Sequence, residues 1–90
     1  MRTKTDIKRL YRQAHAAGLV SAPDDSAINR AWRAYQKNID NPGDCAGDDS
    51  LLSGLAIGQA CIGLRPGWIP EVQKIGCAIA KMIEKDKAQD

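Results

Sequence analysis

The chain has 90 residues, of which 43% are hydrophobic and 27% are charged, and its formal net charge is +2. This length predicts one domain, residues 1–90, with a small hydrophobic core. No apolar run approaches the roughly 20 residues that a membrane-spanning helix needs, so we expect no membrane partner.

A first helix is predicted over residues 6–17, with Thr5 as its N-cap. Apolar side chains recur at helical spacing from Ile7 to Ala17, and Gly18 is a suitable residue for the end of the helix. This pattern is typical of an amphipathic helix that packs on a core. Three cations fall on its opposite face: Lys8, Arg9 and Arg12.

A second helix is predicted over residues 22–39, because Pro23 and two aspartates suit a first helical turn. Its apolar face is formed by Ile28, Ala31, Trp32, Tyr35 and Ile39. At 100° per residue, three cations lie about 180° away from that face: Arg30, Arg33 and Lys37. This segment is the most clearly amphipathic one in the chain.

An acidic loop at about residues 40–48 is predicted next, followed by a helix over residues 49–64 that Asp48 or Asp49 caps. Residues 51–64 contain no charge. A helix that is apolar nearly all round must be covered nearly all round, so this is the expected central helix of the core. Its small residues recur one turn apart: Gly54, Ala56, Gly58 and Ala60. They favour close packing on a helix of the same chain or, alternatively, a homodimer interface.

A last helix is predicted over residues 70–85, because Pro70 is well suited to a first helical position. The connection that contains Arg65 and Trp68 is short, which favours antiparallel neighbours. Gly76 repeats the small-residue spacing of the preceding helix. The predicted fold class is therefore all-α, a compact four-helix bundle with short connections and one acidic loop.

The sequence contains no recognisable catalytic, cofactor or metal motif. His15 is the one histidine, and Cys45, Cys61 and Cys77 lie sixteen residues apart without a C-x-x-C pair. We expect no enzyme activity, no cofactor and no metal site. An odd number of cysteines favours reduced thiols. Cations interrupt the first apolar segment, which argues against a signal peptide, so the expected location is cytoplasmic.

The charges are unevenly distributed, and this asymmetry motivates the functional hypotheses. Residues 1–37 carry eight cations against three carboxylates, and residues 38–50 carry four aspartates and no cation. A basic half suits an acidic partner, nucleic acid included. The leading hypothesis is a small adaptor or inhibitor that binds another protein, with this set of contact residues: Arg30, Arg33, Lys37, Arg65 and Trp68.

Two alternatives remain open. The first is a non-specific nucleic-acid-binding protein that uses the basic faces of the first two helices, with these residues: Lys8, Arg9, Arg12, Arg30, Arg33 and Lys37. The second is a structural homodimer packed through residues 51–64. Small helical proteins with uneven charge are common among phage and mobile-element accessory proteins, an association that favours an inhibitor.

Overall fold

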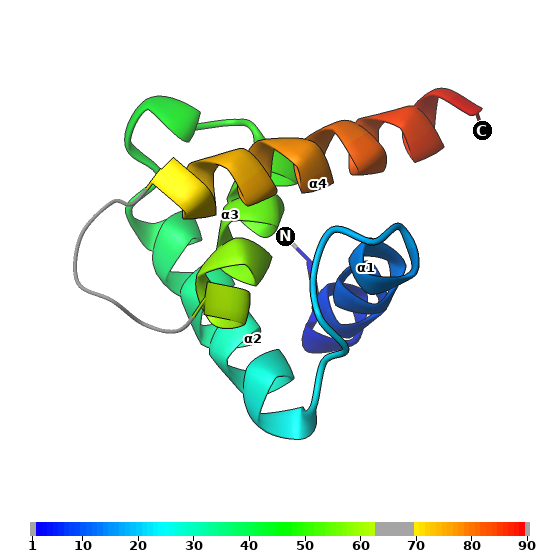
Figure 1. Ribbon diagram of the computed structural model, residues 1–90. Coiled ribbons are helices and arrows are strands. Elements are labelled where there is room, and N and C mark those ends of the chain that lie inside the picture. Colours follow the sequence, from blue (N-terminus) through cyan, green and yellow to red (C-terminus); the bar gives the residue numbers. More distant parts are fainter. Residues whose placement is uncertain (1, 63–69, 90) are drawn as a thin grey trace.

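The computed structural model describes residues 2–62 and 70–89, the last three without their side chains (Figure 1). The described residues form four helices and one short 3-10 turn: α1 (Lys4–Ala16), α2 (Asp25–Asp40), η1 (Gly43–Cys45), α3 (Asp49–Ile62) and α4 (Pro70–Gln89). No strand occurs in these ranges. The all-α bundle predicted from the sequence is confirmed.

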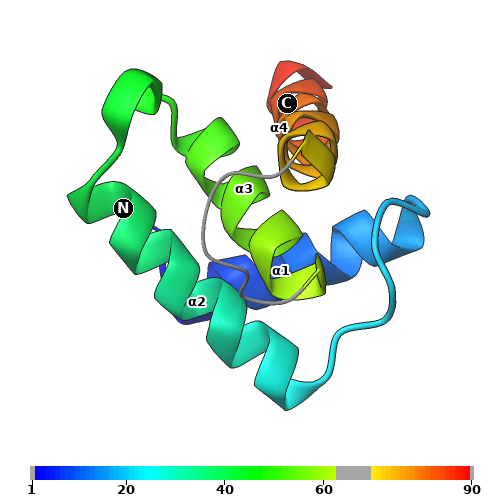
Figure 2. The ribbon, with the colours of Figure 1, turned by 60° about the vertical axis from the view of Figure 1, so that its left-hand side comes forward.

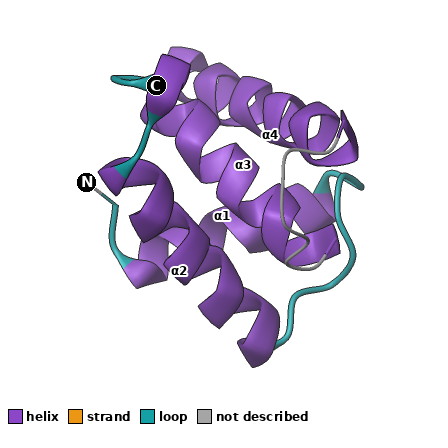
Figure 3. Cartoon of the chain, turned by 90° about the vertical axis from the view of Figure 1, so that its left-hand side faces the viewer, coloured by secondary structure: helices purple, strands orange, loops and turns teal. Residues whose placement is uncertain are grey.

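Helix α3 is the centre of the bundle. It packs along α4 on one side and along α2 on the other, and α1 contacts all three of these helices (Figures 2 and 3). From residue 50 to residue 60, only Leu51 and Gln59 keep appreciable exposure. The prediction that the uncharged segment forms the core helix is therefore confirmed for residues 51–62, the part of the segment that the structure describes. None of the helices in the described ranges combines the length and the apolar character needed to cross a bilayer.

The contact between α3 and α4 depends on glycines. A Cβ atom built on Gly54 would overlap the carbonyl oxygen of Gly76, and a Cβ atom on Gly58 would lie 3.2 Å from the carbonyl oxygen of Val72. In the reverse direction, a Cβ atom on Gly76 would lie 3.0 Å from Cα of Leu55. Small side chains let the two backbones approach this closely. The glycines of α3 are therefore covered by α4 of the same chain.

Helix α1 begins earlier than predicted, because the N-cap is Thr3 and not Thr5. The Asp6 amide donates a 3.2 Å hydrogen bond to Thr3 Oγ1, and the Thr3 amide donates a 2.9 Å bond to Asp6 Oδ2. This reciprocal capping box satisfies two amides that the first turn otherwise leaves unpaired. Gly18 ends the helix as predicted, with φ of 78°, and its amide donates to the carbonyl of His15.

The start of α2 and the end of α4 also differ from the predicted positions. Asp24 is the N-cap of α2, since its carboxylate accepts a 2.7 Å hydrogen bond from the Ala27 amide. Pro23 therefore precedes the helix instead of lying in its first turn.

Asp48 caps α3 by accepting a hydrogen bond from the Leu51 amide at 3.1 Å, as predicted. Helix α4 continues to Gln89, four residues beyond its predicted end, and residues 63 and 64 lie outside the described residues.

Candidate interaction surface

The cations of α1 lie beside α2 because the apolar faces of both helices turn inward. Lys4 and Lys8 of α1 line a shallow cleft of about 410 Å³ together with Asp25 and Asn29 of α2. Ile28, a core residue, lies at the same cleft and is almost fully buried. The cleft thus has a charged rim over a closed apolar base, and it offers both hydrogen-bond donors and acceptors to a ligand.

The outer face of α1 extends this positive region. Lys8, Arg9 and Arg12 line a second open hollow of about 460 Å³ on the same helix. Arg9 and Arg12 are exposed, and Lys8 is half-buried where it joins the two hollows. Three of the residues predicted for nucleic-acid contact are therefore brought together on one helix face.

Helix α2 continues the row of cations away from the cleft. Arg33 follows Asn29 by one helical turn and Lys37 follows Arg33 by another, so the three side chains share a face. Both cations are exposed. We call the following set the basic surface: Lys4, Lys8, Arg9 and Arg12 of α1, with Arg33 and Lys37 of α2.

Arg30 has a different environment from its predicted neighbours. Its Nη2 donates a 3.3 Å hydrogen bond to the carbonyl of Ala60, and its Nη1 donates a 2.8 Å bond to Ser26 Oγ. Its Nε atom is buried and has no partner among the described residues. The guanidinium therefore links α2 to the C-terminal end of α3, where a cation interacts favourably with the helix dipole. This placement gives Arg30 a structural contact inside the bundle.

Two other predicted contact residues cannot be located, because Arg65, Trp68 and the rest of the 65–69 turn lie outside the described residues.

Carboxylates are interspersed among the cations of the basic surface. Asp25 lines the same cleft as Lys4 and Lys8. Asp6 lies 3.4 Å from Arg9 Nη2, and the hydrogen bond that its carboxylate accepts from the Thr3 amide is the main reason that the pKa of Asp6 is lowered. The surface is therefore a mixed one with an excess of positive charge. It differs from a uniform stripe of cations.

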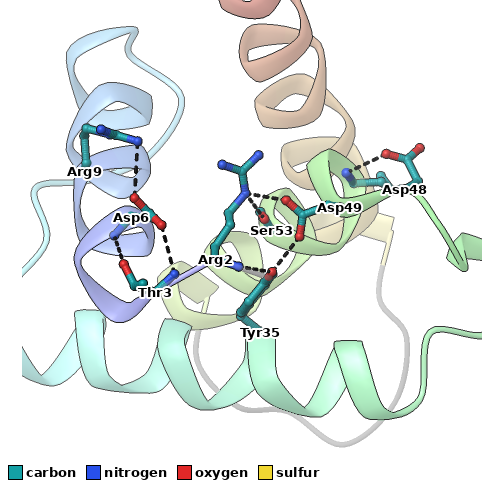
Figure 4. A network of polar contacts seen from close by, with 9 residues as sticks. Arg2, Thr3, Asp6, Arg9, Tyr35, Asp48, Asp49 and Ser53 are labelled. Atoms are coloured by element: carbon teal, nitrogen blue, oxygen red, sulfur yellow. Dashed lines mark hydrogen bonds and ion pairs between the residues drawn. The ribbon is translucent and has the colours of Figure 1, made fainter.

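A polar network that the sequence analysis did not find joins the N-terminal segment to α2 and α3 (Figure 4). Arg2 Nε lies 2.6 Å from Asp49 Oδ2 and 3.0 Å from Ser53 Oγ. The Arg2 amide donates to Tyr35 Oη at 2.9 Å, and that hydroxyl donates to Asp49 Oδ1 at 2.6 Å. Burial raises the pKa of Tyr35 above its ordinary value, while the bond from Arg2 acts in the opposite direction.

The polar groups of this network are bonded within the chain, except for Arg2 Nη2, which is buried and has no partner among the described residues. Each of its hydroxyls and the Asp49 carboxylate is already bonded within the chain. One sequence signal pointed to it: Ser53 is polar within the uncharged segment and, being fully buried, needs a hydrogen-bond partner. The identity of that partner, 51 residues away, depends on the tertiary fold.

The remaining candidates for chemistry are dispersed. His15 Nδ1 lies 3.0 Å from the carbonyl of Val20, so the imidazole takes part in the α1–α2 connection. Cys61 Sγ lies 3.8 Å from Ser21 Oγ, and all three cysteines are unpaired thiols. Across residues 2–62 and 70–89, no three metal-binding side chains converge.

Comparisons with protein-family models, with curated proteins and with solved structures gave no match. The functional argument therefore depends on the residues and contacts of this chain.

Proposed function

We propose that the protein is a non-enzymatic adaptor or inhibitor that binds an acidic surface of another protein through the basic surface. The observation that carries this proposal is the cleft between α1 and α2, where Lys4 and Lys8 lie beside Asn29 and Asp25. A protein surface presents carboxylates and amide donors together, so it can pair with both kinds of group in the cleft. Charge complementarity of this type gives specificity and fast association.

The mixed charge of the surface favours a protein over nucleic acid as the partner. A phosphate backbone is uniformly negative, and it would meet Asp25 in the cleft and Asp6 beside Arg9. Nucleic-acid binders neutralise phosphates with many cations, and a nearby carboxylate weakens each such contact. Arg30 is a contact residue in both hypotheses, but its guanidinium already donates hydrogen bonds to the carbonyl of Ala60 and to Ser26 Oγ. Because Arg30 is engaged within the fold, a nucleic acid has one cation fewer to contact.

The homodimer hypothesis loses its motivation in this fold. It required the small residues of α3 to be available to a second chain, and α4 covers Gly54 and Gly58.

A cytoplasmic location stays part of the proposal. It is supported by the three unpaired thiols, since such thiols are typical of reducing compartments.

Charge reversal with a matched control tests the proposed function. Lys8→Glu/Arg12→Glu changes the basic surface, and Lys81→Glu/Lys85→Glu makes the same charge change at exposed positions of α4. Each tagged protein is used to capture partners from nuclease-treated lysate, and each captured protein is purified and titrated directly. We expect at least one acidic protein to bind the wild type and the α4 variant, and to lose binding to the α1 variant.

Titration with a 20-base-pair duplex at two salt concentrations separates the alternative. Non-specific nucleic-acid binding predicts an affinity that falls steeply with salt. In a plot of the logarithm of the binding constant against the logarithm of the salt concentration, the slope is about −1 for each phosphate contacted. Such a slope, abolished by Lys8→Glu/Arg12→Glu, would replace the protein-binding proposal with the nucleic-acid one. Equal capture by the two charge-reversal variants would show that the basic surface is not the binding site.

A further inference from the structure

A third hollow lies where the end of α2, the η1 turn, the start of α3 and the first turns of α4 meet. Its volume is about 520 Å³, which is within the range of roughly 300–1,000 Å³ that is typical of ligand sites. Leu51 and Leu55 of α3 and Cys77 of α4 contribute apolar lining. Leu51 and Cys77 are only half-buried. We call this hollow the η1 groove, and η1 lies on the side of the molecule away from α1 (Figures 1 and 2).

The rim of the η1 groove is polar and acidic. Asp44, Asn41 and Gln73 are all exposed and line it, and Asp40 immediately precedes Asn41. Of the four aspartates in residues 38–50, Asp48 caps α3 and Asp49 pairs with Arg2. The other two are exposed, and neither is bonded to another described residue. An exposed carboxylate at the rim, that of Asp44, beside an apolar floor attracts a ligand that is both cationic and apolar.

We propose that the η1 groove binds a short basic peptide segment of a partner protein, which inserts one large apolar side chain against Leu51, Leu55 and Cys77. A lysine or arginine next to that anchor then lies beside Asp44. The exposed amides of Asn41 and Gln73 can donate to and accept from the backbone of the peptide. A buried apolar anchor with a hydrogen-bonded polar rim is the usual anatomy of a protein-binding hot spot.

The charge of the rim also excludes other occupants. Anionic lipid headgroups and phosphates would be repelled by Asp44. The basic surface of a second copy of this chain would bring cations, but its six residues include no large apolar side chain to fill the floor. The proposal is independent of the basic surface, so either site can fail without affecting the other.

The cysteines provide a direct probe of occupancy. Cys45 and Cys77 both line the η1 groove, whereas Cys61 lies near the opposite end of α3 and serves as an internal reference. The wild-type protein is first used to select from a displayed library of random heptapeptides. The rate at which maleimide modifies each cysteine is then measured by mass spectrometry, with and without a selected peptide.

We expect the selected peptides to combine lysine or arginine with at least one large apolar residue. At ten times its dissociation constant, a selected peptide should slow the modification of Cys45 and Cys77 about tenfold, because only unoccupied protein reacts. The rate at Cys61 should not change. Asp40→Lys/Asp44→Lys should abolish this protection, and Glu84→Lys/Asp86→Lys, an equal charge change at exposed positions of α4, should retain it.

Several results would overturn the proposal. These are the absence of any selected peptide, selection of acidic peptides, and equal protection of Cys61. Protection that increases with protein concentration alone would assign the groove to a second copy of the chain instead. Because the selection and the thiol rates do not involve the basic surface, these results leave the proposed function to its own test.

Discussion

Adding one methyl group at Gly54 should destabilise the protein far more than adding one at Gly58. A new Cβ atom at Gly54 would overlap the carbonyl oxygen of Gly76 and would lie 3.2 Å from both the carbonyl carbon of Gly76 and the amide nitrogen of Ala80. All of these are backbone atoms, so no side chain can rotate to make room. The two helices would have to separate, and the packing around Leu55 would loosen with them.

The size of the effect follows from two opposing terms. Overpacking a well-packed core costs about 1–3 kcal/mol, and backbone contacts place Gly54→Ala at the upper end. Replacing glycine by alanine inside a helix gains about 1 kcal/mol. We therefore expect Gly54→Ala to lower the free energy of unfolding by about 2 kcal/mol. At Gly58 the nearest atoms would be Val72 O at 3.2 Å and Ile75 Cγ2 at 3.5 Å, so a small shift suffices and the net effect should be near zero.

Urea unfolding followed by circular dichroism at 222 nm measures both variants. For a domain of this size the slope is about 1 kcal/mol per molar urea, so the midpoint of Gly54→Ala should fall by about 2 M relative to Gly58→Ala. The two variants have the same change in composition and the same change in helix propensity, which isolates the packing term. Equal midpoints would refute the close contact between α3 and α4, and with it the argument that the small residues are satisfied within one chain.

Three further predictions concern the polar contacts. In a double-mutant cycle of Arg2→Met and Asp49→Asn, urea unfolding should give a coupling energy of about 1–2 kcal/mol, and additive effects would contradict the ion pair. Because burial raises the pKa of Tyr35, the native state holds the phenol proton more tightly than the unfolded state, so the free energy of unfolding should fall as pH rises through and above the ordinary tyrosine range. Tyr35→Phe should flatten this part of the curve of stability against pH. An unchanged slope would contradict the raised pKa of Tyr35. Arg30→Met should lower the thermal midpoint, whereas Arg33→Met at an exposed position should leave it within a degree or two, since surface substitutions usually change stability by less than about 0.5 kcal/mol.

The fold was predictable from the sequence because the helical patterns are local. The uncharged segment 51–64 required covering on all sides, and the paired spacing of small residues favoured close packing on α4. The ends of helices were less predictable, because several adjacent residues compete for the same cap. Thr3 takes the N-cap in place of Thr5 because its hydroxyl and the Asp6 carboxylate can bond reciprocally, and that pairing needs a spacing of three residues.

The candidate sites were predicted only in part, because they depend on contacts between distant residues. The helical wheel placed Arg30 with Arg33 and Lys37 on the outer face, about 180° from the apolar one. Only the position of α3 relative to α2 shows that Arg30 can reach the carbonyl of Ala60, 30 residues away. The η1 groove likewise combines residues from four elements, and no local pattern joins Cys45 to Cys77.

The aspartates of the acidic loop have two different environments that its composition does not distinguish. Asp48 and Asp49 act within the fold, one as a helix cap and one as the partner of Arg2, so their charges are compensated. Asp40 and Asp44 stay exposed, and Asp44 lines the η1 groove. If the basic surface binds an acidic protein and the η1 groove binds a basic peptide, as we propose, the molecule can hold two partners of opposite charge at once. Such a geometry favours an adaptor over a simple inhibitor, because an inhibitor needs only one of these surfaces. If a protein bound at the basic surface and a basic peptide bound at the η1 groove exclude one another in a competition titration, this preference is wrong.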